Sequence, residues 1–584
     1  MSCWATRMDM LLKYVFNATK FVLGVLIFIN TVNLTKENII TSRNSQYVFK
    51  VGQENKFMLF RRLLDHDFIL RHQIIAVEKV RVYEDTLKPE ATMKVKNTHN
   101  FARDRNNSHN LENGNYYGMG IPKAWSRGYN GEGVTIAVTD VGVNTDLLDL
   151  KDNINTELSY NFVKGTTDVT PEFFHNLQEK NITQLLLMLK IYQVKLFNDQ
   201  IPILEPSHWT ASDIISRALV HASDDIDIYA NAWAPTKPFD KLDLATRDAI
   251  VDSAENGRHG LGTIHVVPSG PPGNGLANSI HTITVNSMGR HGTISTYSYD
   301  IDASVLTSGL GDGQNLTAYS MVTTTLKNKC ITGFKGVSAA TTQISAIIGL
   351  AIQANPNISF RDVQHLIVQA SEYKSLEESI SFTPNGAGRH FHKMFGFGLL
   401  NADRIVMLAE RHSPVPELFS KTLDSFRKRS SETQTYDVCY TCDMFSRHNC
   451  LASIEHVVLE MNKGGVPEHT YIALKSPQGT TSVLLDLKHN QGPSVRKLKL
   501  TSVHFWDEIA FGTWRLYVTN NHSSQTDIGR TSLTLYGTAN ADVPPSIQLP
   551  EVICENYTNI GNGSHIARTT NNITTADTSY ETLF

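Results

Sequence analysis

The chain has 584 residues, of which 41% are hydrophobic and 19% are charged, so it is long and apolar enough for two or three domains with buried cores. Its formal net charge of −4 at pH 7 argues against a nucleic-acid partner and against a strongly acidic field that would steer substrates.

The first 33 residues are typical of a signal peptide, with a signal anchor as the alternative. A short apolar run at 21–32 follows Arg7, Lys13 and Lys20, and it is shorter than a comfortable membrane span. Such an anchor is the only membrane contact that we expect. Many Asn-x-Ser/Thr triplets favour a glycoprotein of the secretory pathway (endoplasmic reticulum, Golgi, secretory vesicle) or the extracellular space. The expected glycosylation sites are Asn106, Asn181, Asn315, Asn357, Asn521, Asn556, Asn562 and Asn572.

Residues 40–112 predict a small α+β unit. Apolar and polar residues alternate at Tyr47–Val51, which indicates a strand, and the stretch at 57–64 predicts a helix.

From residue 116 to 412, short apolar strands alternate with helical stretches, which predicts a parallel sheet covered on both faces. The expected strands lie at 134–139, 226–233, 263–267 and 281–285, and a helix is expected at 244–255. Chemistry in such sheets gathers at the carboxyl ends of the strands. Asp140 and the pair Ser269-Gly270 both fall at such ends.

A glycine-rich turn delivers Ser338 to the start of an apolar helix that reaches residue 354, and a second helix is expected from 360 to about 373. The unpaired N–H groups and the dipole at a helix N-terminus can stabilise a nucleophile and the oxyanion that it generates. The alternative is that Ser338 serves only as the N-cap of the helix.

Beyond residue 412 the pattern changes. Residues 413–436 are typical of a linker, and 437–540 contain short strands separated by turns, which predicts an all-β sandwich or jelly roll. Residues 541–584 are rich in Thr, Asn and glycosylation triplets and are expected to be disordered. Cys439, Cys442 and Cys450 indicate local disulfide chemistry, with one of the three left over.

Several of these segments together resemble the subtilisin-like proprotein convertases of the kexin/furin type, a family of serine peptidases. The segments 128–142, 226–235, 258–270 and 361–369 and the Ser338 turn resemble their peptidase domain, and 476–480, 512–516 and 535–538 resemble their jelly-roll P domain. The segments 159–162 and 415–419 are most similar to the neuroendocrine, prohormone-processing branch. The resemblance implies an α/β subtilisin-like peptidase domain, a prodomain, and a calcium-dependent serine endopeptidase that cuts proproteins and prohormones after paired basic residues.

The resemblance also assigns roles to residues. In such a triad the serine attacks, a histidine takes its proton and an aspartate holds the imidazole. Asp140 and Ser338 match the family positions, and His175 is the nearest candidate for the histidine by spacing. Asp149 matches a calcium ligand, Pro271 stands at the oxyanion-hole position, and three residues match the substrate pocket: Trp233, Lys237 and Asn274.

The chain departs from the family pattern at several of these positions. His175 stands in Phe-His-Asn, whereas the family has His-Gly-Thr, and a faulty gene model across 163–210 is one explanation. Pro271 replaces a side-chain donor, whose loss reduces turnover by about 10²–10³ in other proteases. Lys237 and Asn274 replace acidic residues, and the loop that would complete the calcium site of Asp149 is missing.

Two hypotheses therefore remain open. The chain is an active convertase with altered catalysis, or it is a secreted pseudoprotease that binds convertases, their prodomains or their substrates. Hydrolysis of a dibasic peptide discriminates between them.

Overall fold

A computed structural model describes residues 39–43, 46–51, 56–61, 118–140, 142–143, 145–146, 150–162, 165–170, 190–195, 210–235, 238–289, 301–311, 321–324, 330–334, 336–376, 380–429, 434–441, 450–462, 470–487, 497–519 and 528–539. The expected signal segment at 1–33 and the expected tail at 541–584 lie outside these ranges.

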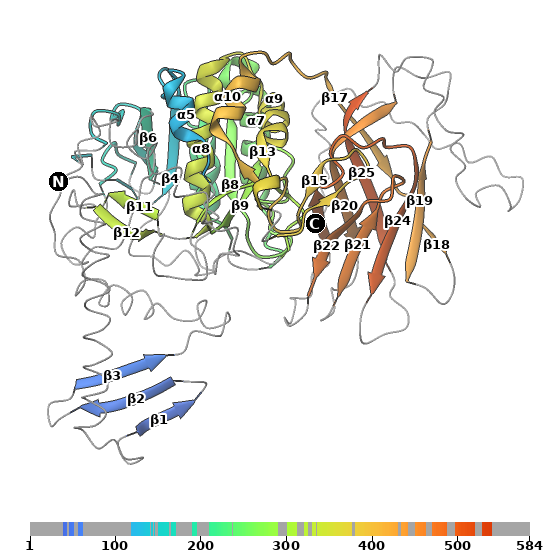
Figure 1. Ribbon diagram of the computed structural model, residues 1–584, viewed down its shortest axis with the longest axis horizontal. Helices are drawn as coiled ribbons and strands as arrows, with labels where there is room; N and C mark the ends of the chain where they lie inside the picture. Colours follow the sequence, from blue (N-terminus) through green and yellow to red (C-terminus); the bar gives the residue numbers. More distant parts are fainter. Residues whose placement is uncertain are drawn as a thin grey trace, which may run out of the picture.

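The central element of the first large domain is a nine-stranded sheet in the order β13-β16-β10-β9-β8-β7-β4-β6-β5 (Figure 1). Every neighbouring pair is parallel except β13 and β16, which are antiparallel. The strands are β4 (Thr135–Asp140), β5 (Tyr160–Asn161), β6 (Lys190–Lys195), β7 (Ile228–Ala230), β8 (Ile264–Pro268), β9 (Ile283–Met288), β10 (Val305–Leu310), β13 (Ser371–Glu372) and β16 (Leu399–Leu400).

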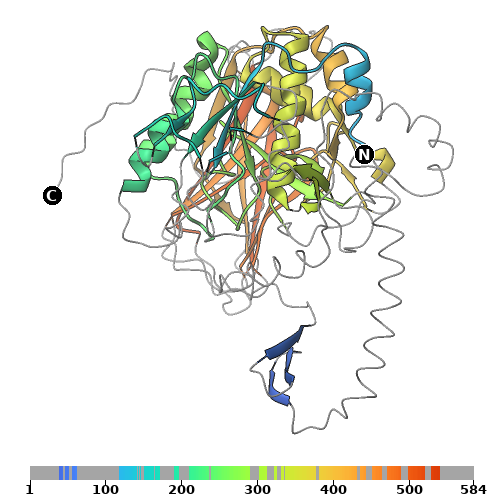
Figure 2. The same cartoon turned by 90° about the vertical axis from the view of Figure 1, so that its left-hand side faces the viewer.

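Alternate residues of these strands face opposite layers of helices, as a sheet buried on both sides requires. Val266 packs into the cluster that contains the core of α8, whereas its neighbour Val267 packs with residues of α6 and α7. Figure 2 shows helices on both sides of the sheet. The helices of this domain are α5 (Ile121–Ser126), α6 (Thr210–Leu219), α7 (Leu244–Gly260), α8 (Val337–Ala354), α9 (Phe360–Ala370), η5 (Lys374–Leu376) and α10 (Ala402–Ala409).

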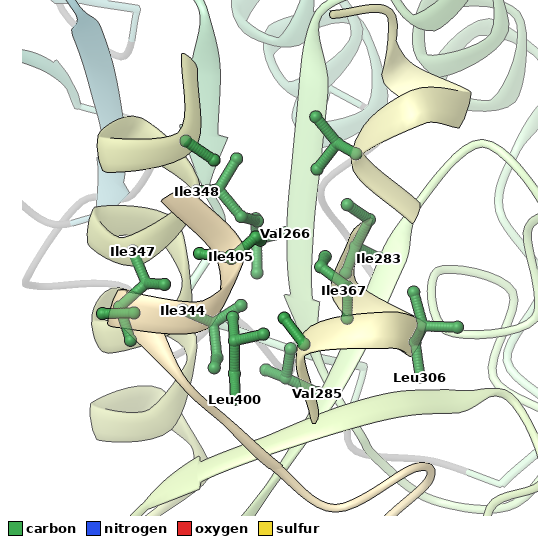
Figure 3. Packing of buried hydrophobic residues seen from close by; sticks show 14 of the residues in the cluster. Val266, Ile283, Val285, Leu306, Ile344, Ile347, Ile348, Ile367, Leu400 and Ile405 are labelled. Atoms are coloured by element: carbon green, nitrogen blue, oxygen red, sulfur yellow. The ribbon is translucent and has the colours of Figure 1, made fainter. Parts of the chain in front are cut away.

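Helix α8 forms the middle of the core and touches β4, β7, β8, β9 and β10. Its buried Ile344 and Ile348 face Val266 and Val285 of the sheet (Figure 3). The helix is long and apolar enough to span a membrane, but 78% of that stretch is buried inside the protein, so it is a core helix. Two small hairpins complete the domain: β11 (Met321–Thr324) with β12 (Cys330–Phe334), and β14 (Thr383–Pro384) with β15 (His390–Phe391).

The second large domain is an antiparallel sandwich of two sheets, in the orders β17-β25-β20-β23 and β18-β19-β24-β21-β22. Trp514 and Phe505 are fully buried in the core between these sheets. The strands are β17 (Leu418–Leu423), β18 (Arg427–Lys428), β19 (Thr435–Tyr440), β20 (Leu451–Asn462), β21 (Tyr471–Lys475), β22 (Thr481–Asp486), β23 (Lys497–Ser502), β24 (Gly512–Thr519) and β25 (Arg530–Ala539).

Two expectations from the sequence are wrong. Residues 57–61 of the stretch at 57–64 are not helical: β3 (Lys56–Arg61) pairs antiparallel with β2 (Gln46–Val51), which also pairs with β1 (Ile39–Arg43). A short apolar run of this kind is compatible with a helix or a strand, and here hydrogen bonding to the neighbouring strand makes it a strand. The expected linker at 413–436 contains β17, which forms six residue pairs with β25, so the sandwich begins well before residue 437.

The two domains are joined by polar contacts around α9. Arg361 on α9 makes a bidentate ion pair with Glu455 of β20, with N–O distances of 3.1 and 2.5 Å. Asn385 donates to the backbone carbonyls of His504 (3.0 Å) and Trp506 (2.8 Å). These contacts fix the sandwich beside the parallel sheet (Figure 1).

Candidate active site

Three chain segments leave the sheet together at the carboxyl ends of β4, β7 and β8. In the parallel register Val138 pairs with Ala230, and Ala230 pairs with Val266. Asp140, which ends β4, is therefore level with Ala232, two residues beyond β7. Neighbouring strands lie about 4.8 Å apart, so these segments form one edge.

Ser338 is held at this edge by the first turn of α8. Gly336 is the N-cap, with a φ of 99° that favours glycine, and no side chain caps the helix. The alternative role of Ser338 as an N-cap is therefore wrong. Its half-buried hydroxyl donates to the carbonyl of Ala232 at 2.8 Å, which ties the helix start to the segment after β7. A serine here faces the unpaired N–H groups of the first turn.

A buried hydrogen-bond chain joins the end of β4 to the segment after β7. The hydroxyl of Thr139 donates to the side-chain carbonyl of Asn231 at 2.7 Å and accepts from the indole N–H of Trp233 at 3.0 Å. Thr139 and Asn231 are 0% exposed. Trp233, predicted to belong to a substrate pocket, is thus held by Thr139, the residue before Asp140.

The segment after β8 forms a closed loop around Pro271. Asn274 is 0% exposed, and its amide donates to the carbonyl of Pro271 at 3.1 Å while its side-chain oxygen accepts from the N–H of Ala277 at 2.9 Å. Ser269 is also buried, and its hydroxyl has no hydrogen-bond partner. The amide of Asn274 therefore stabilises the loop instead of facing a ligand.

Asp302, a residue that the sequence did not single out for function, is buried just before β10. Its carboxylate accepts hydrogen bonds from the hydroxyl and N–H of Ser304. Burial raises the pKa of Asp302 to about 6, although these hydrogen bonds oppose the shift.

The other predicted site residues, His175, Asp149 and Lys237, lie outside the part of the chain that the structure describes. Within that part, no three His, Cys, Asp or Glu side chains form a group that could hold a metal ion. Strand β6, at 190–195, is hydrogen-bonded between β4 and β5, so part of the unusual segment at 163–210 is integrated into the sheet.

Comparison with known proteins agrees with this architecture. Residues 131–398 match the model of the subtilase family, and residues 454–535 match the proprotein convertase P-domain. The chain is 30% identical over 465 residues to neuroendocrine convertase 2 of Drosophila melanogaster, an alignment that covers 72% of this chain and 69% of that protein. The chain belongs to the subtilisin-like proprotein convertases.

Other convertases have a similar sequence identity to this chain. The chain is 30% identical to human proprotein convertase subtilisin/kexin type 4 over 452 residues, which is 72% of this chain and 59% of that protein. Its fold is similar to that of a serine protease of Aeromonas sobria, with a TM-score of 0.57, 18% identity and coverage of 70% of this chain and 89% of that one. The subtilisin-like fold and the P domain expected from the sequence are thereby confirmed.

Two features of this convertase bear on its compartment. Cys439 and Cys450 are both disulfide-bonded, as the cysteine spacing indicated. Asn357 lies exposed between α8 and α9, where a glycan would meet no core residue. The other seven expected glycosylation sites fall outside the described residues.

Proposed function

We propose that this chain is a convertase homologue of the secretory pathway that binds basic segments of proproteins or prodomains in the convertase cleft and hydrolyses them slowly or not at all. The proposal rests above all on Pro271. Proline has no side-chain donor and no backbone N–H, so it offers nothing to a developing oxyanion.

The neighbours of Pro271 do not replace the missing donor. The amide of Asn274 donates to the carbonyl of Pro271 itself. The hydroxyl of Ser338 is donated to Ala232, so it must leave that partner before it can approach a histidine. These contacts support binding without efficient turnover.

An active endopeptidase is the second candidate, because Asp140 and Ser338 are both kept at one edge of the sheet. Members of this family generally depend on calcium, and their substrates are proproteins. The described residues offer no grouped acidic ligands, and Asp149 lies outside them, so no step of the proposal uses the ion.

The test is hydrolysis of a fluorogenic Arg-Arg peptide by the full-length secreted protein with calcium, beside Ser338→Ala as a matched control. We expect the parent rate to exceed that of the control little or not at all, while fluorescence anisotropy shows that both bind the peptide. Turnover as fast as that of an active convertase assayed beside it, lost in Ser338→Ala, would refute the proposal. Pro271→Asn adds a donor and should raise turnover only if the triad is otherwise complete.

A further inference from the structure

A run of three basic residues lies on the surface of the sandwich. Arg427 and Lys428 form strand β18, Arg429 follows it, and all three residues are exposed. Strand β18 stands at one end of its five-stranded sheet, on the side of the sandwich away from the parallel sheet (Figure 1). The peptidase domain therefore does not cover these three adjacent cations.

The backbone of this run is extended and is held by one neighbouring strand. Among the described residues β18 pairs with β19 alone, through two residue pairs. The N–H of Arg429 adds a hydrogen bond to the carbonyl of Thr435 at 2.9 Å. Because β18 is the last strand of its sheet, another extended chain can pair along its outer side, as a strand of a peptide-binding protein does with its ligand.

The sequence contains two other runs of adjacent basic residues, at 61–62 and 496–497. Lys497 opens β23, and the next residue, Leu498, is 3% exposed and packs in the core of the sandwich. A protease that held the chain on both sides of Lys497 would have to pull this leucine out of the core. Opening β18 moves no buried side chain of the run, so 427–429 is the more accessible of the two runs in the sandwich.

We propose that the peptide bond after Arg429 is a processing site, cut by a separate endopeptidase that recognises paired basic residues. Lys428 and Arg429 supply the two cations, and the guanidinium group can form charge-assisted hydrogen bonds with a carboxylate of that enzyme. Water adds across the amide bond, which leaves a carboxyl group on Arg429 and an amino group on Ser430. The inference goes beyond the proposed function and does not depend on whether this chain itself hydrolyses peptides.

The two products should remain joined after the cut. Strand β17 belongs to the amino-terminal product, and it forms six residue pairs with β25 of the other product. The bidentate ion pair of Arg361 with Glu455 also connects the two products. Cleavage therefore nicks the sandwich without separating the domains, and it becomes visible when the protein is denatured and its disulfides are reduced.

The experiment is limited proteolysis of the full-length Ser338→Ala protein, under native conditions, by an active convertase that cleaves after paired basic residues. A paired-basic reference peptide in the same mixture shows that the enzyme stays active. We expect the first cut within the sandwich to appear on a reducing, denaturing gel and to be assigned by mass spectrometry to the bond after Arg429. The nicked protein should elute unchanged from a size-exclusion column.

Two matched variants test the assignment. Arg429→Gln removes the guanidinium group from an exposed position and should slow the cut by about 100-fold or more, because the protease then leaves its own polar groups unpaired. Lys497→Gln removes a cation from the other basic run of the sandwich and should leave the rate unchanged. The cut in the chain that retains Arg429 is mapped without any substitution at 429, so the test does not depend on how the variant folds.

Three outcomes would overturn the inference. One is an intact bond after Arg429 while the reference peptide is consumed. Another is a cut after Arg429 that needs urea, since the fold would then protect the run. The third is a cut that forms in the parent protein incubated alone and is absent from Ser338→Ala, which would assign the cleavage to this chain instead of a separate enzyme. Hydrolysis of the Arg-Arg peptide tests the proposed function separately, so the two proposals can fail independently.

Discussion

Acidification should weaken this protein through two histidines buried where the domains meet. His456 is 4% exposed and lies edge-on to Trp506 at 5.3 Å, and His504 is 0% exposed and stacks on Phe391 at 4.3 Å. Burial lowers the pKa of His456 to about 4 and that of His504 to about 3. Both rings are therefore neutral in the folded protein at pH 5.5, whereas in the unfolded chain they take up protons near pH 6.5.

The sign and size follow from proton linkage. Because the unfolded state binds more protons below pH 6.5, these histidines do not reduce the free energy of unfolding above that pH, and they reduce it progressively as the pH falls. Each histidine costs about 1.4 kcal/mol by pH 5.5, and the pair about 3 kcal/mol. Asp302, whose pKa is raised to about 6, acts in the opposite sense and offsets less than about 1 kcal/mol at that pH.

Urea unfolding at pH 7.5 and 5.5 measures this loss. His504→Asn removes one titrating ring and can keep the contact that the Nδ1 atom makes with the hydroxyl of Ser482 at 2.8 Å. The loss of stability on acidification should then shrink by about 1.4 kcal/mol. His259→Asn is the control, because His259 is exposed and its left-handed φ of 56° suits asparagine. Equal losses in parent and His504→Asn would refute the reasoning.

Two further predictions use single sites. Arg361→Ala leaves Glu455, which is 1% exposed, without its guanidinium and should lower stability by about 3 kcal/mol in thermal unfolding. The surface pair of Lys497 and Glu460, at 3.8 Å, is the control, and Lys497→Ala should cost less than about 1 kcal/mol. Similar shifts in both variants would contradict this reading of the interface. Asn357→Gln should remove one glycan, seen as a faster band before, and not after, treatment with an N-glycosidase; unchanged mobility would show that the site is not used.

The core of the peptidase domain could be predicted from the sequence because its apolar residues recur at the regular spacings of helices and strands. The isoleucines of α8 recur at helical spacing, and the short runs of β4 and β8 are mostly apolar and are buried on both faces, so helix and parallel strand follow directly. The segment 418–423 does not have that advantage. Its side chains are alternately exposed and partly buried, with no apolar run. Only its pairing with β25 makes it a strand of the sandwich. Such pairing depends on a partner more than 100 residues away in the sequence.

The site could be predicted only in part, for a similar reason. Asp140 stands at a strand end and Ser338 at a helix start, and both positions can be read from local pattern. The burial of Asp302 gave no local signal, because it depends on segments far away in the sequence, such as that of Lys393, whose carbonyl accepts from the N–H of Asp302. Ser338 also showed that a local pattern leaves roles open, since Gly336 and not the serine proved to be the N-cap.

The unusual residues of the Pro271 loop make more sense as a set than one by one. A proline at 271 leaves its carbonyl as the only polar backbone group at that position, and Asn274 satisfies it through both its side chain and its N–H. The side chain and N–H of Asn274 are thus used within the loop, as buried polar groups require. With proline at 271 and Asn274 occupied in this way, neither residue offers a donor to an oxyanion, which agrees with the proposal of impaired turnover.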